Sequence, residues 1–398
     1  MAEYVLVGRE APGVVRRTAV TVVTTYYRPV LGGAEAAAER LARYLVRRGH
    51  AVEVLTKRTN DRIPADEVID GVTVHRLAPT GERNGRGKWA VSPSVFRALL
   101  RRGRGAGVVC CVDYRGVGLA ALAARAVTGV PVIFQAQTEG ILSGDFVRAW
   151  FAAPLYRRAD AIGCISRDLE REALAAGVPN DRVHYLPNPI DGVRFSPATG
   201  PARLALRAEL GVAADAVVAT FVGRLSREKG VVELVRAWSQ AKPDARLVVI
   251  GPPMTDHPWD VSAEARALAE QSSAGDTIVF LGGQPTERVA QWLSIADFAI
   301  QPSHFEAMGL AAAEAMASGL PVIASDTGGY RDFVIPEETG LLVPVRDVDA
   351  LARAIQRLAA DATLRQRLGV GARRRVEPFD AQVVLEQFAE LIDRLAAR

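Results

Sequence analysis

The stretch PSHFEAMGLAAAEAMASGLPVIASDTGG, residues 302–329, decides the fold of this chain. An apolar run at 298–300 predicts a buried strand before it, and PVIAS at 321–325 predicts another strand inside it. Between these strands, Gly309 and Gly319 bracket a predicted helix that is apolar on nearly every face. A helix of that kind is buried, so the stretch predicts a strand-helix-strand unit of a parallel sheet covered on both faces.

Two glutamates give this stretch its chemistry. Glu306 lies in the polar loop before the predicted helix, and Glu314 lies within the helix. A buried carboxylate is costly unless something hydrogen-bonds it, so Glu314 requires a partner. The loop 303–309 leads into a helix N-terminus and offers backbone N–H groups to an anion or a hydroxylated ligand. A helix cap at Glu306 and an internal salt bridge at Glu314 are the structural alternative.

Length and composition bound the class of protein. At 398 residues the chain is too long for one ordinary domain, and it predicts two domains of roughly 190 residues each. A hydrophobic content of 49% indicates a folded globular protein. The net charge of +4 comes from scattered arginines, so it favours anionic ligands only weakly and predicts no nucleic-acid partner. The three cysteines lie in apolar runs without metal-ligand spacing and are expected to be reduced core thiols: Cys110, Cys111 and Cys164.

The sequence contains no apolar stretch of the ~18 residues that a membrane span needs. Acidic residues stand near the N-terminus, where a signal peptide would be basic and then apolar, so a cytoplasmic enzyme is expected. The sequence of residues 1–17 predicts neither a helix nor a strand. A helix near 94–102 carries Phe96 and Leu100 together with four arginines: Arg97, Arg101, Arg102 and Arg104. This face suits either plain solvent or anionic lipid, which would place the enzyme at the inner membrane face.

Short apolar strands alternate with amphipathic helices along the whole chain. Strands are predicted at 18–27, 51–56, 71–77, 107–112, 131–136 and 160–166, and then at 217–223, 245–251, 277–283, 297–302, 321–325 and 341–344. This rhythm predicts a parallel sheet with helices on both faces in each half. The proline-rich stretch at 186–202 breaks the rhythm and predicts the linker between the halves.

The opening stretch resembles the donor-site signature of retaining family 4 glycosyltransferases of the GT-B fold. It has the form P-S-x-x-E-x-x-G-L-x-x-x-E-A-M-A-x-G-x-P-V-I-A-x-x-x-G-G, and it departs from the family at Ala307, where Gly or Ser is frequent. The resemblance implies an α/β architecture of two Rossmann-like, doubly wound domains that face a central cleft. An acceptor-binding domain would span 1–188 and a donor-binding domain 189–378, with the C-terminal helix 379–398 packing back on the first.

The resemblance also implies an activity. Such an enzyme moves a hexose or N-acetylhexosamine, with retention, from a UDP- or GDP-sugar to a hydroxyl group of a sugar, a lipid-linked sugar or a small molecule. Glu306 would contact the donor sugar, and Glu314 would bind the ribose hydroxyls. The residues that follow Glu306 would contact the sugar and the phosphates: Ala307, Met308, Gly309 and Leu310.

Two cations stand after a strand of the second half. The run at 217–223 leads into RLSREKG at 224–230, which places Arg224 and Lys229 at the carboxyl end of a strand, before a helix. A guanidinium and an ammonium beside free amides form a phosphate clamp, although a solvated surface pair is the alternative. The stretch is similar to the family's G-R-x-x-x-x-K-G, whose cations neutralise the donor diphosphate. By that resemblance, no metal and no Asp-x-Asp motif are expected.

Further candidates follow other predicted strands. Gly32 and Gly33 either open a helix or let the backbone approach a ligand, and the family's similar G-G-x-E faces the donor phosphates. Gln137 stands where many relatives have a histidine, and it can hydrogen-bond a sugar hydroxyl without acting as a base. In a front-face mechanism the leaving phosphate can take the acceptor proton. Acceptor contacts are expected at Asp113, Tyr114 and Glu139, and by resemblance the nucleobase is expected near Gly251, Gly282 and Gln284.

Two alternatives remain from the sequence. The residues 116–121 form G-x-G-x-x-A after a strand, with Glu139 about twenty residues on, which favours an NAD-dependent oxidoreductase. That reading leaves the glutamate pair and the two cations unexplained. The other alternative is a protein that binds a nucleotide sugar without turnover, because Gln137 replaces the histidine. The sequence does not predict the base, the sugar, the acceptor, the linkage or the oligomeric state.

Overall fold

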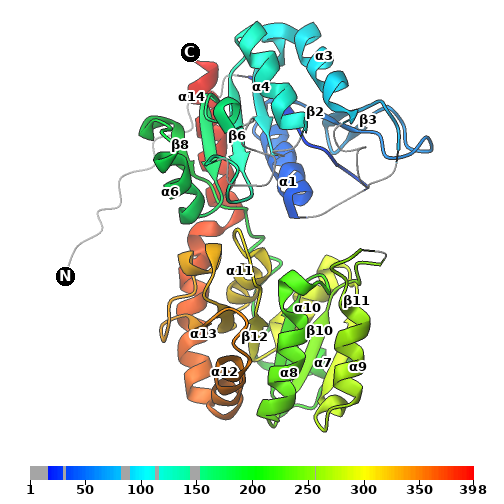
Figure 1. Ribbon diagram of the computed structural model, residues 1–398, viewed down its shortest axis with the longest axis vertical. Coiled ribbons are helices and arrows are strands. Elements are labelled where there is room, and N and C mark those ends of the chain that lie inside the picture. Colours follow the sequence, from blue (N-terminus) through cyan, green and yellow to red (C-terminus); the bar gives the residue numbers. More distant parts are fainter. Residues whose placement is uncertain (1–16, 30–32, 82–89, 113–115, 144–152, 256) are drawn as a thin grey trace, which may run out of the picture. The chain divides into compact units, whose positions relative to one another are not determined.

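The computed structural model describes residues 17–29, 33–81, 90–112, 116–143, 153–255 and 257–398 (Figure 1). The described chain forms two compact units. The first unit comprises the residues up to Gly163, Ala173–His184 and Leu385–Arg398, and the second comprises Cys164–Glu172 and Tyr185–Val384. The domain limits at 188 and 378 stay a prediction.

The first sheet has eight strands in the order β3-β4-β2-β1-β5-β6-β7-β8. These strands are β1 (Ala19–Val23), β2 (Ala51–Lys57), β3 (Asp66–Ile69), β4 (Val72–Leu77), β5 (Val108–Cys111), β6 (Val132–Ala136), β7 (Ala161–Cys164) and β8 (Val183–Tyr185). The helices of this half are α1 (Gly33–Arg47), α3 (Ser92–Arg102), α4 (Gly116–Thr128), α5 (Ala153–Tyr156) and α6 (Arg167–Ala175). The pairs β1/β2, β1/β5, β2/β4 and β5/β6 are parallel, as predicted.

The prediction of a purely parallel first sheet is wrong at its edge. β3 pairs with β4 in the antiparallel direction, and neither β3 nor the three-residue β8 is predicted from the sequence. β3 has the sequence DEVI, and none of its side chains is buried. An edge strand faces solvent, so it lacks the apolar run by which a central strand is identified.

The last helix, α14 (Ala381–Ala396), ties the end of the chain to α1 within the first unit. The Tyr44 hydroxyl and the Arg48 guanidinium both donate to the Glu386 carboxylate. His50 is buried, with its Nε2 3.9 Å from Asp393 Oδ1. Burial lowers the pKa of His50, so this contact joins a neutral ring to the helix at neutral pH.

The second sheet has six strands in the order β11-β10-β9-β12-β13-β14, and all its pairs are parallel. Its strands are β9 (Val218–Val222), β10 (Arg246–Ile250), β11 (Ile278–Gly282), β12 (Phe298–Gln301), β13 (Val322–Ser325) and β14 (Gly340–Val343). Its helices are α7 (Gly200–Glu209), α8 (Val231–Ala241), α9 (Ser262–Glu270), α10 (Thr286–Ile295), α11 (Leu310–Ala317), α12 (Val348–Ala360) and α13 (Ala362–Val376). Chain order along the sheet reverses between β9 and β12, which is the switch point at which ligands bind in open α/β sheets.

Helices cover both faces of the second sheet (Figure 1). α8, α9 and α12 pack in one core, α7, α10 and α11 pack in the other, and α13 contributes side chains to both. Within β10, Leu247 and Val249 enter the first core, and Val248 and Ile250 enter the second. Because both faces are buried, each central strand reads as a continuous apolar run, which is the pattern that predicted it.

The helix α7 lies in a part of the chain for which the sequence pattern predicts neither a helix nor a strand. Its Pro201 lies in the first turn, where a missing N–H costs nothing, so proline here does not exclude a helix. Arg207 is only 1% exposed, and its guanidinium donates to the carbonyls of Ala213, Ala216 and Ile295. It also lies 3.6 Å from Asp297. The buried Arg207 therefore anchors α7 together with Leu206, which packs partly buried against the core. Because the most buried side chain of this helix is charged, the usual apolar periodicity is weakened.

We expect Arg207→Met to lower the free energy of unfolding by about 3 kcal/mol, because buried carbonyls and Asp297 lose a charged partner. Denaturant-induced unfolding measures this change. Arg288→Met is the matched control, since Arg288 contacts Glu209 of the same helix at 3.0 Å in an exposed pair. It should change stability by no more than about 0.5 kcal/mol. Equal losses in the two variants would contradict an anchoring role for Arg207.

Candidate functional site

Two loops meet at the switch point of the second sheet. One, 223–230, follows β9, and the other, 302–309, follows β12. Gly230 has φ +67°, and a Cβ there would overlap the Pro302 carbonyl oxygen. The backbone N–H of His304 donates to the Glu228 carbonyl at 2.7 Å. Contacts between backbone atoms alone therefore hold these two loops together.

Side chains from the two loops form a charged centre. Lys229 Nζ donates to Glu306 Oε2 at 2.5 Å, and the two side chains are 20% and 18% exposed. The Tyr330 hydroxyl lies 3.5 Å from the same carboxylate oxygen and 3.1 Å from Ser303 Oγ. Burial, together with the Glu306 charge, raises the pKa of Tyr330 well above its ordinary value. The hydroxyl consequently stays protonated and donates to the carboxylate.

Arg224 lies on the same loop as Lys229 but in a different setting. Its side chain is 54% exposed, and it contacts Glu228 at 2.8 Å. An exposed ion pair of this kind contributes about 0–1 kcal/mol. An entering phosphate can therefore replace Glu228 as the partner of Arg224 at little cost, since a guanidinium binds phosphate oxygens with two parallel hydrogen bonds.

The N-terminus of α11 faces the same edge of the sheet. Gly309 is its N-cap, with φ +91°, and a Cβ there would overlap the Tyr330 ring. The first intrahelical bond runs from Ala313 N to Gly309 O, so the preceding amides lie at the positive end of the helix. Glu314 lies in the middle of α11, as predicted, and is 9% exposed. Met308 is buried, and its Sδ accepts from the Asn188 amide.

The residues predicted near a nucleobase lie at the carboxyl ends of the neighbouring strands β10 and β11. Gly251 N donates to Gly282 O at 2.9 Å, and Gln284 Nε2 donates to Leu281 O at 2.8 Å. Leu225 N donates to Pro252 O, which joins this corner to the loop of Arg224. One edge of the second sheet thus collects the predicted donor residues of that half: Arg224, Lys229, Gly251, Gly282, Gln284, Glu306, Ala307, Met308, Gly309, Leu310 and Glu314.

The candidates of the first half belong to the first unit. Gly33 begins α1, while Gly32, Asp113 and Tyr114 lie outside the described residues. Gln137 and Glu139 follow β6 and are partly buried. The cysteines are buried free thiols, as predicted, and burial raises the pKa of Cys164 to about 12.

The glycine motif behind the oxidoreductase alternative does not form a turn. Gly116, Val117 and Gly118 lie in the first turn of α4 and are buried. A dinucleotide fingerprint requires its first glycines in the exposed turn between strand and helix, where the backbone can approach a pyrophosphate.

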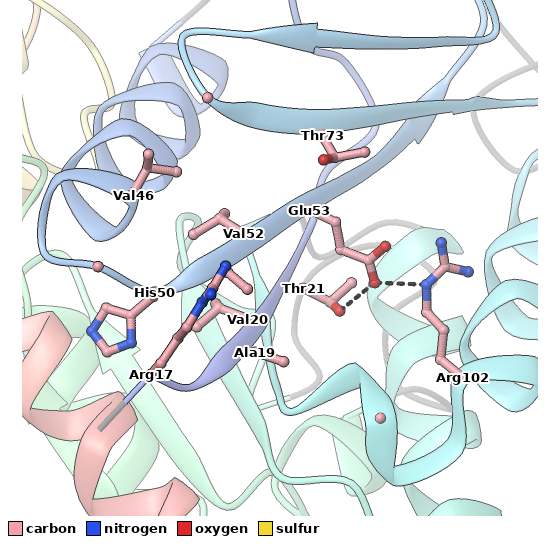
Figure 2. Close-up of a pocket in the computed structure, with 14 residues that line it drawn as sticks. Arg17, Ala19, Val20, Thr21, Val46, His50, Val52, Glu53, Thr73 and Arg102 are labelled. Atoms are coloured by element: carbon pink, nitrogen blue, oxygen red, sulfur yellow. Dashed lines mark hydrogen bonds and ion pairs between the residues drawn. The ribbon is translucent and has the colours of Figure 1, made fainter. Parts of the chain in front are cut away.

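A cavity of about 660 Å³ opens in the first unit at the amino ends of β1 and β2 (Figure 2). Glu53 accepts from Thr21 at 2.8 Å and from Arg102 at 2.6 Å, along one wall of this cavity. This corrects the expected arginine face of α3, because Arg102 is paired inside the fold. The other members of that face are exposed: Arg97, Arg101 and Arg104.

The described ranges contain neither a metal-binding cluster nor a membrane-spanning helix. Within them, no three His, Cys, Asp or Glu side chains are grouped so as to hold a metal ion. In the same part of the chain, no helix is long and apolar enough to cross a membrane. That the reaction needs no metal stays a prediction.

Three residues in or next to the charged centre are not predicted from the sequence: Ser303, His304 and Tyr330. Ser303 and His304 come soon after β12, and Tyr330 follows the two glycines after β13. The signal that could have found them is their position just beyond the carboxyl end of a buried strand, where ligand-binding residues gather in parallel sheets.

Two family models match the chain. The model described as glycosyl transferases group 1 matches residues 203–375, and the model described as glycosyl transferase 4-like domain matches residues 32–189. A D-inositol 3-phosphate glycosyltransferase from Xylanimonas cellulosilytica is 32% identical to this chain, covering 92% of it and 94% of the relative.

Solved structures share the fold over almost the whole chain. Sucrose-phosphate synthase from Thermosynechococcus elongatus superposes with a TM-score of 0.82 at 27% identity, covering 96% of this chain and all of that one (100%). HepE from Anabaena, solved with UDP-glucose, superposes with a TM-score of 0.77 at 20% identity, covering 95% of this chain and 100% of its own. At that identity HepE shows likeness of fold alone.

The overlap at Gly309 yields a stability prediction. Gly309→Ala should lower the free energy of unfolding by about 3 kcal/mol, because it adds a left-handed backbone strain and a collision with Tyr330. Gly319→Ala is the matched control, with φ +81° but its nearest neighbour, Pro197, 3.6 Å away. The control should lose only about 1 kcal/mol. Denaturant titration compares the two, and equal losses would show that the Tyr330 ring can move aside.

Proposed function

Because this chain belongs to the glycosyl transferases group 1 family, we propose that it transfers a hexose or N-acetylhexosamine from a nucleoside diphosphate sugar to a hydroxyl group. The family and the solved structures confirm the predicted GT-B glycosyltransferase. The observation that carries the finer proposal is the 2.5 Å contact between Lys229 and Glu306 at the switch point. A cation for phosphate and a carboxylate for sugar hydroxyls are adjacent there.

Each part of a nucleotide sugar has a counterpart on this edge of the second sheet. Arg224, Lys229 and the first turn of α11 supply positive charge for the diphosphate. Glu314 would accept hydrogen bonds from the ribose hydroxyls, and Glu306 would accept them from the sugar. Backbone groups at Gly251 and Gly282 would hold the base. Because HepE is solved with UDP-glucose, UDP-sugars are the first donors to test and GDP-sugars the second.

The proposed reaction needs no separate base. The acceptor oxygen bonds to the anomeric carbon as the bond from that carbon to the phosphate oxygen breaks, and the acceptor proton passes to the departing phosphate on the same face. Attack and departure on one face retain the configuration. Arg224 and Lys229 stabilise the charge that develops on the leaving diphosphate, which is the role of a metal in other transferases. Gln137 would orient the acceptor hydroxyl.

The acceptor and the cellular location are also proposals. The relative from Xylanimonas is named for D-inositol 3-phosphate, which makes that compound the first acceptor to test. We propose a cytoplasmic enzyme, because nucleotide sugars are the proposed donors. The exposed arginines of α3 and of the short 3-10 helix that follows it (Gly103–Ala106) offer a peripheral contact with anionic lipid: Arg97, Arg101 and Arg104. Co-sedimentation with anionic and neutral vesicles tests that contact, and equal binding to both would contradict it.

Calorimetric titration with UDP, GDP and ADP in the presence of EDTA tests the donor site. We expect one nucleotide to bind, and Lys229→Ala and Glu314→Ala each to weaken it by about 1–3 kcal/mol, because each removes a charged hydrogen-bonding partner. Arg236→Ala is the control, since Arg236 lies on the exposed side of α8, 3.9 Å from Glu264. Unchanged binding in all three variants would remove the proposed site from this edge.

Product stereochemistry tests the mechanism. NMR of the newly formed linkage should show the anomeric configuration of the donor sugar, and EDTA should leave the transfer rate unchanged within a factor of about two. An inverted product would exclude the front-face reaction. The alternative function, binding without turnover, would be supported if nucleotide sugars bind but neither transfer nor donor hydrolysis occurs with any acceptor tested.

A further inference from the structure

A second polar cluster lies beside the charged centre. Arg346 Nε donates to His304 Nδ1 at 3.3 Å, and His304 Nε2 lies 3.1 Å from Glu233 Oε1. The histidine and glutamate side chains are only 11% and 18% exposed. The three residues come from separate places along the chain. Glu233 lies in the first turn of α8, His304 after β12, and Arg346 between β14 and α12.

The donors and acceptors of this cluster fit one protonation pattern. A guanidinium can only donate, so His304 Nδ1 must be the acceptor in the contact with Arg346. The proton of the neutral ring is then on Nε2, which faces the Glu233 carboxylate. The series from Arg346 to Glu233 is therefore guanidinium, imidazole and carboxylate. His304 Nε2 and the second carboxylate oxygen of Glu233 are both buried and make no hydrogen bond, so the 3.1 Å contact between the ring and the carboxylate is electrostatic.

Arg346 occupies a backbone conformation that disfavours arginine. Its φ is +65°, and it occupies the third position of a turn closed by Asp347 N and Pro344 O at 3.2 Å. Such a turn favours glycine at this position. The Asp347 side chain then caps α12 by accepting from Ala350 N. The strained backbone of Arg346 is explained if its guanidinium makes a contact that the function requires.

The cluster connects directly to both charged residues of the site. His304 stands two positions before Glu306, and its own N–H is bonded to the carbonyl of Glu228, which precedes Lys229. Glu233 stands four positions after Lys229, in the first turn of α8. We propose that Arg346, His304 and Glu233 form a positioning relay that holds Lys229 and Glu306 in register to receive the donor diphosphate. This inference rests on the proposed function of that site.

The decisive variant is Arg346→Gly, because the backbone strain affects stability while the guanidinium affects donor binding. Glycine relieves the left-handed conformation, so the melting temperature should stay the same or rise. Loss of the Arg346 guanidinium should nevertheless raise the donor KM about threefold to tenfold, which is the effect expected from losing one hydrogen bond. Lys242→Gly is the matched control: Lys242 is exposed, has φ +43°, and lies at the opposite end of α8. It should keep the wild-type KM.

Substitutions of His304 test the middle of the relay. His304→Ala should raise the donor KM at least as much as Arg346→Gly, and the double variant should add little, because both remove the same series of contacts. His304→Asn keeps an acceptor close to the position of Nδ1, so it should recover part of the loss. Full additivity of the two single effects, or no recovery by asparagine, would overturn the relay.

Hydrogen exchange separates failure of the relay from failure of the proposed function. In protein without nucleotide, Arg346→Gly should increase amide exchange across 302–309, and Lys242→Gly should not. Equal exchange in both variants would overturn the relay, whether or not donors bind. If the wild type binds no nucleotide, the proposed function fails, and the exchange result still decides whether the relay orders the loop. A rise in KM together with a rise in exchange supports both.

Discussion

The close approach of Gly230 to the Pro302 carbonyl is the contact on which the site of the second unit depends. Parallel strands bring their carboxyl ends to one edge, but that alone leaves the following loops several ångströms apart. Only a residue without a Cβ lets the loop after β9 come this near the loop after β12. Lys229 then reaches Glu306, and the His304 amide reaches Glu228. The charged centre is a consequence of that backbone packing.

The two cations, each paired with a carboxylate, differ in their own exposure. Arg224 is 54% exposed in its pair with Glu228, so that contact costs little to exchange for one with a phosphate. The pair of Lys229 with Glu306 is mostly buried and is supported by Tyr330. Breaking it would leave a carboxylate that needs another donor, which a sugar hydroxyl can supply. The arrangement therefore favours a ligand that brings anionic and hydroxyl groups together over a bare phosphate.

The two halves of the chain differ in how far sequence reasoning reaches. In the second, motif and spacing predict Glu306, Arg224 and Lys229, and the fold places them in the two loops at one sheet edge. In the first, Gln137 departs from the expected histidine, and Arg102 turns inward to Glu53 rather than outward. Under the proposed function, a donor common to many enzymes would need a recurring set of groups in one half, while the acceptor site in the other half would fit a particular partner. Its chemistry consequently leaves a weaker pattern.

The amino-acid sequence by itself determined the strand and helix rhythm, the burial of the glutamate helix and the chemical types gathered at the site. These follow from local periodicity and from which residues bind phosphate and sugar. Only the tertiary structure decided that Tyr330 supports Glu306, that Arg207 anchors α7, and that Arg346, His304 and Glu233 meet. Such partners are distant in the chain, and their meeting depends on strand order and register. Local propensity does not encode that order, because it arises from how whole layers pack.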